Sequence, residues 1–73
     1  MQPIFEAEAR CFESHRQQWI REGHLEQWVA LRDHELLGFF RDPFEAWRTG
    51  VERWGAWDLF VKQVLHEDPE YRI

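Results

Sequence analysis

The sequence predicts one α+β domain over residues 1–73, with the element order α-β-β-α-β and a three-stranded mixed sheet. Two segments space their apolar residues as amphipathic helices do, and three short segments read as strands. Glycine and polar residues separate them. The expected parts are an N-terminal helix within 1–23, a ββαβ core over 28–65 and an acidic tail over 66–73.

The first helix is predicted from Pro3 to Glu22. Pro3 suits a first helical turn, and Gly23 suits the position after the last one. One face is apolar, and it needs a surface to cover. Its residues are Phe5, Ala9, Phe12, Trp19 and Ile20.

Two alternating segments, Trp28–Arg32 and Leu36–Arg41, predict a hairpin with Asp33 and His34 as its turn. This turn would place Leu31 opposite Leu36 and Val29 opposite Gly38. Apolar residues lie on both faces of the second strand. Both faces of the sheet are therefore expected to be covered, by two helices or by a helix and a partner.

Asp42-Pro43-Phe44-Glu45 predicts the start of a second helix. Asp42 can accept from the first-turn amides, Pro43 loses no hydrogen bond there, and Glu45 can reach back in a capping box. The helix is expected to end near Trp54, before Gly55. Gly50 lies mid-helix, which indicates either a close approach to the sheet or plain tolerance. The apolar stripe consists of Phe44, Trp47, Val51 and Trp54.

Residues 57–65 predict the third strand. A short strand–helix–strand connection favours a third strand parallel to the second and beside the first, which gives the order 2-1-3. A third strand beside the second is the alternative.

The formal net charge is −5, with nine Lys and Arg against fourteen Asp and Glu. Binding to nucleic acid or to an anionic membrane surface requires clustered basic residues, so we expect neither partner. No apolar run approaches the roughly 20 residues of a membrane span, and no signal peptide is visible. Cys11 is the single cysteine. These features favour a cytoplasmic protein without disulfides.

The catalytic and metal-binding patterns are weak. Cys11 and His15 stand four residues apart on one helix, but a closed zinc site needs four ligands. Ser14 and His15 are adjacent in sequence, so we expect their side chains to point about 100° apart. The four glycines stand alone, so no phosphate-binding loop is present. We therefore expect no enzyme activity, no cofactor and no metal.

Aromatic residues point to surface contacts instead, because five Trp, six Phe and one Tyr exceed what one small core needs. Periodicity assigns Trp47 and Trp54 to the core. The predicted exposed anchors are Trp19 and Trp57. A hairpin face of Trp28, Leu37 and Phe39, rimmed by arginines, is a further candidate, as are the free sheet edges. The predicted partner-binding residues are Trp19, Trp28, Arg32, Phe39, Arg41 and Trp57.

The segment Trp28–Val64 resembles a family of very small bacterial proteins of unknown function. The resemblance lies in the Trp28-Val-Ala-Leu strand, Leu36-Leu37-Gly38, the Glu45-Ala46 step and the strand Leu59–Val64. It implies a strand–strand–helix–strand fold and carries no catalytic motif. Small antitoxin proteins use the same element order.

The sequence thus favours a non-catalytic protein-binding module, an accessory subunit, adaptor or inhibitor of a larger bacterial protein. A structural homo-oligomer and an antitoxin or immunity-type protein are the alternatives.

Overall fold

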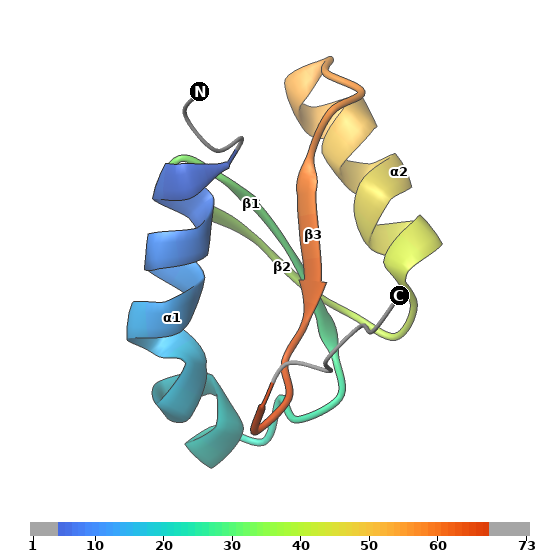
Figure 1. Cartoon of the computed structure of the whole chain (residues 1–73). Helices are drawn as coiled ribbons and strands as arrows, with labels where there is room; N and C mark the ends of the chain where they lie inside the picture. The colour runs from blue at the N-terminus through green and yellow to red at the C-terminus, as the bar shows by residue number, and fades with distance from the viewer. Residues whose placement is uncertain (1–4, 68–73) are drawn as a thin grey trace, which may run out of the picture.

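The computed structural model describes residues 5–67 and has the α+β element order that the sequence predicts. The elements are α1 (Glu6–Arg21), β1 (Trp28–Arg32), β2 (Glu35–Phe40), α2 (Pro43–Trp54) and β3 (Phe60–Gln63). The sheet lies between the two helices (Figure 1). Both of its faces are therefore covered by helices of the same chain. Neither described helix combines the length and the apolar character needed to cross a membrane.

The strand order is β2-β1-β3, as predicted, with β1 in the centre. β2 and β3 each pair antiparallel with β1, so they share a direction without being neighbours. The expectation of a mixed sheet is thereby corrected, because every hydrogen-bonded pair in the sheet is antiparallel. α2 carries the chain from one edge of the sheet to the other (Figure 1).

The hairpin contains a β-bulge that the sequence did not predict. Leu31 pairs with Leu36, as expected, but Ala30 pairs with Gly38, so Leu37 is an extra residue in β2. Val29 consequently lies opposite Phe39 and not opposite Gly38. Beyond the bulge, every β2 side chain is on the opposite face from the one that regular alternation assigns.

The main core lies between α1 and one face of the sheet. Its buried members from the sheet side are Val29 and Leu31 of β1 and Val64 after β3, and those from α1 include Phe12 and Trp19. Phe12 and Trp19 meet edge to face, with ring centroids 5.7 Å apart. Large aromatic side chains therefore fill the space between α1 and the sheet.

The bounds of β2 and β3 differ from the prediction. α1 begins at Glu6. The predicted start at Pro3 lies outside the described residues, and so does most of the predicted tail (66–73). β2 runs from Glu35 to Phe40, one residue earlier than expected. β3 covers only Phe60–Gln63 of the predicted 57–65, because the segment after Gly55 first turns back along α2.

Asp42 caps α2 as the sequence predicts. Its Oδ1 accepts from the backbone N–H of Glu45 at 2.8 Å, and Pro43 occupies the first turn. We expect Asp42→Ala to lower the free energy of unfolding by about 1 kcal/mol, because an amide of the first turn loses its acceptor. Asp42→Asn keeps an acceptor oxygen and should cost much less. Urea denaturation of both variants tests this, and equal losses would contradict the capping role.

Candidate functional site

Two small residues bring α2 close to the sheet. Ala46 and Gly50 are buried one helical turn apart, and α2 lies against all three strands. A Cβ placed on Gly50 would lie 2.6 Å from Cδ1 of Leu59. Of the two readings of Gly50, close approach is therefore the one that the structure supports, and the side chain approached is that of Leu59, directly before β3. The line of contact runs through the small residues and not along the aromatic stripe of the helix.

The aromatic stripe of α2 consequently lies partly in solvent. Phe44 is 65% exposed, although it belongs to the apolar spacing that predicted the helix. Trp47 is half-buried, and its ring centroid lies 5.9 Å from that of Phe44. Trp54, at the C-terminal end of the stripe, is also half-buried. Periodicity assigned both tryptophans to the core, and the structure places both at its margin.

Trp57 completes an exposed aromatic surface. It is 72% exposed, and its ring centroid lies 5.4 Å from that of Trp47. Gly55 ends α2 in the left-handed conformation, with φ 67°, and its N–H donates to the carbonyl of Val51 at 2.8 Å. This cap turns the chain back along the helix. Phe44, Trp47 and Trp57 are hereafter called the aromatic cluster.

A hydrogen bond joins two members of the aromatic cluster. The indole Nε1 of Trp47 donates to the backbone carbonyl of Trp57 at 2.8 Å. The start of α2 is fixed by the Asp42 cap, and its end is fixed by Gly55. The three rings thus project from a capped helix and from the short segment tied back to it, which fixes the backbone from which they extend.

Arg48 borders the aromatic cluster. It is exposed and follows Phe44 by four residues, which places the two side chains next to each other on the helix surface. Within residues 5–67, neither Arg48 nor Arg41 takes part in an ion pair. The border of the cluster therefore offers a positive charge that no described side chain neutralises.

Trp19 is not an exposed anchor, which corrects the prediction. It is 5% exposed. Its ring meets Phe12 and Phe39 edge to face, and the His15 ring stacks on it at 5.3 Å. The signal was present in the sequence, because Trp19 follows Phe12 by two helical turns and therefore shares its buried face.

The predicted hairpin face does not exist as one surface. Because of the bulge, Phe39 lies opposite Val29 on the α1 side, where its ring stacks on His24 with centroids 3.6 Å apart. Trp28 lies opposite Phe40 instead. Arg32 is exposed, and its guanidinium donates to the carbonyl of Trp54 at 3.2 Å, at the end of α2. Of the six predicted partner-binding residues, only Trp57 belongs to the aromatic cluster.

Cys11, Ser14 and His15 lie closer together than predicted. Ser14 Oγ is 3.3 Å from His15 Nδ1, and the Cys11 Sγ is 3.8 Å from the same nitrogen. Both polar side chains turn back toward the carbonyl of Cys11, to which Ser14 Oγ donates at 3.0 Å. Nδ1 lies 2.8 Å from that oxygen. Because a carbonyl only accepts, Nδ1 carries a proton there, so this nitrogen is not positioned as a base toward the thiol or the hydroxyl.

A polar pocket of about 260 Å³ opens between the hairpin turn and the segment before β3. Glu8, Asp33 and Asp58 contribute carboxylates to its lining, and Arg32 contributes a cation. Glu8 is buried, and its Oε2 accepts from the N–H of Asp33 at 2.7 Å. This carboxylate ties the hairpin turn to α1. Among residues 5–67, no group of three or more His, Cys, Asp or Glu residues is arranged to hold a metal ion.

No family model matches the chain, and neither the curated proteins nor the solved structures contain a match. The resemblance to small bacterial proteins therefore stays a prediction, and any function must be argued from the geometry above.

Proposed function

We propose that this chain is a non-catalytic protein-binding module, an accessory subunit, adaptor or inhibitor, and that a larger protein docks on the aromatic cluster. The observation that supports this is the exposure of Phe44 and Trp57, at 65% and 72%, on either side of Trp47. Large contiguous apolar patches are uncommon on monomeric proteins and mark interaction sites. Tryptophan is also among the residues most enriched at the energetic centres of protein interfaces.

The cluster is suited to binding because it is pre-organised. The hydrogen bond from the Trp47 indole to the Trp57 carbonyl, at 2.8 Å, links the middle of the surface on α2 to the segment that carries Trp57. Rings that are already held in place lose little conformational freedom when a partner binds. Aromatic side chains also offer a large contact area for few rotatable bonds.

The border of the cluster defines the chemistry of the partner. Arg48 is exposed beside Phe44, without an ion pair in the described part of the chain. A complementary surface would place apolar side chains against the rings and a carboxylate against this guanidinium. Arginine pairs well with carboxylates because its planar group can donate two parallel hydrogen bonds. The proposed partner is therefore a protein with an apolar patch bordered by Asp or Glu.

Affinity capture tests the proposal. The tagged wild type, Trp57→Ala and Leu25→Ala are used to capture proteins from the native lysate, and mass spectrometry identifies the products. Leu25 is a matched control, because it is also an exposed apolar residue, at 37%, and lies in the α1–β1 connection. The protein captured by the wild type and by Leu25→Ala, but lost with Trp57→Ala, is then purified. Its binding is measured directly.

We expect Trp57→Ala to weaken that direct binding by at least tenfold, which corresponds to roughly 1.4 kcal/mol. The proposal fails if the same proteins are captured by all three forms. It also fails if the purified partner binds Trp57→Ala as tightly as the wild type.

A further inference from the structure

We draw no further inference here: the strongest candidate, the polar pocket of about 260 Å³ between the hairpin turn and the segment before β3, is an acidic cluster whose one buried carboxylate, that of Glu8, already accepts from the backbone N–H of Asp33 at 2.7 Å, and nothing else among residues 5–67 points to a ligand there.

Discussion

Replacing Phe12 with alanine is expected to lower the free energy of unfolding by about 4 kcal/mol. Phe12 is fully buried, with its ring centroid 5.7 Å from that of Trp19 and 6.2 Å from that of Phe60. Its ring also lies under two cations, with Lys62 Nζ at 4.8 Å and Arg16 Cζ at 5.0 Å from the centroid. Truncation would remove this ring from the centre of the space between α1 and the sheet.

A loss of this size is a large share of the stability of a small domain, since native proteins are stable by only about 5–15 kcal/mol. Urea denaturation followed by tryptophan fluorescence measures it. Phe44→Ala is the matched control, because the same atoms are removed from a side chain that is 65% exposed. Its loss should stay below about 1 kcal/mol. Similar losses for the two variants would show that Phe12 is not the centre of the core.

Local chemistry made much of the fold predictable. The Asp42 cap, Pro43 in the first turn and Gly55 at the end of α2 are all as expected. β1 has the predicted bounds, and Asp33 adopts the left-handed conformation, with φ 54°, in the predicted turn. These features depend on a residue and its near neighbours in sequence. Short-range patterns carry that information in full.

The register of the hairpin was not predictable in the same way. The bulge at Leu37 satisfies two requirements at once, because Leu36 stays opposite Leu31 while Phe39 joins the core on the α1 side. Regular alternation would have placed Phe39 opposite Trp28. The choice depends on how α1, distant in sequence, packs against the strand. A pattern within the strand alone does not contain it.

The candidate site was missed for a related reason. Spacing placed Phe44, Trp47 and Trp54 on one stripe, and a stripe is normally the buried face. In the structure, Ala46 and Gly50 provide the contact with the sheet, and the stripe is rotated away from it. A helix packs closest where its side chains are smallest, so the Ala46–Gly50 pair was the available signal. Trp57 was predicted correctly as exposed because it follows the helix stop.

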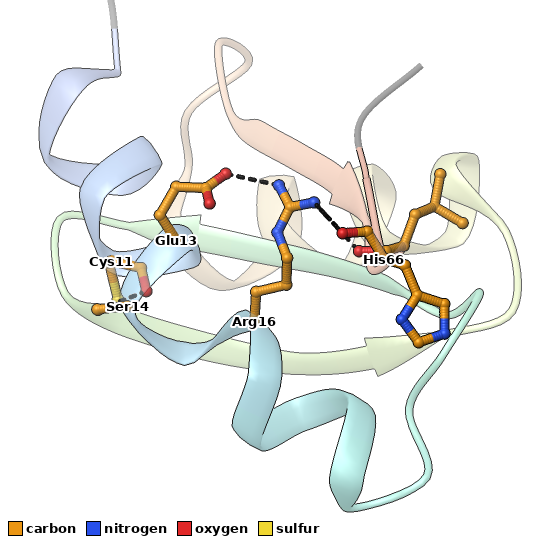
Figure 2. Close-up of polar contacts among 6 residues, drawn as sticks. Cys11, Glu13, Ser14, Arg16 and His66 are labelled. Carbon is orange, nitrogen blue, oxygen red and sulfur yellow. Dashed lines mark hydrogen bonds and ion pairs between the residues drawn. The ribbon is translucent and has the colours of Figure 1, made fainter.

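No local sequence pattern indicated the position of Arg16 either. It belongs to α1 and is only 6% exposed. Its Nη1 donates to the carbonyl of Leu65 at 3.1 Å and to that of His66 at 3.4 Å, and its Nη2 forms an ion pair with Glu13. Figure 2 shows the guanidinium between Glu13 and His66. The Arg16 side chain thus holds the segment after β3 against α1.

We expect Arg16→Met to lower the free energy of unfolding by about 3 kcal/mol. Methionine keeps much of the apolar stem beside Phe12, so the loss reports mainly on the polar contacts. Two carbonyl oxygens lose a charged donor, and a hydrogen bond to a charged group contributes about 1.5–3 kcal/mol. Glu13 can turn to water, because its side chain is 58% exposed, and it therefore adds little to the loss.

Chemical denaturation and hydrogen exchange together test the role of Arg16. Arg10→Met is the matched control on the same helix, because that side chain is 78% exposed and pairs only with Glu6 in the described part of the chain. Its loss should be below about 1 kcal/mol. In Arg16→Met, amides near Leu65 should exchange faster than those of β1, because the fastening is lost locally before the sheet opens. Unchanged exchange there, or equal losses for the two arginines, would mean that Arg16 does not hold this segment.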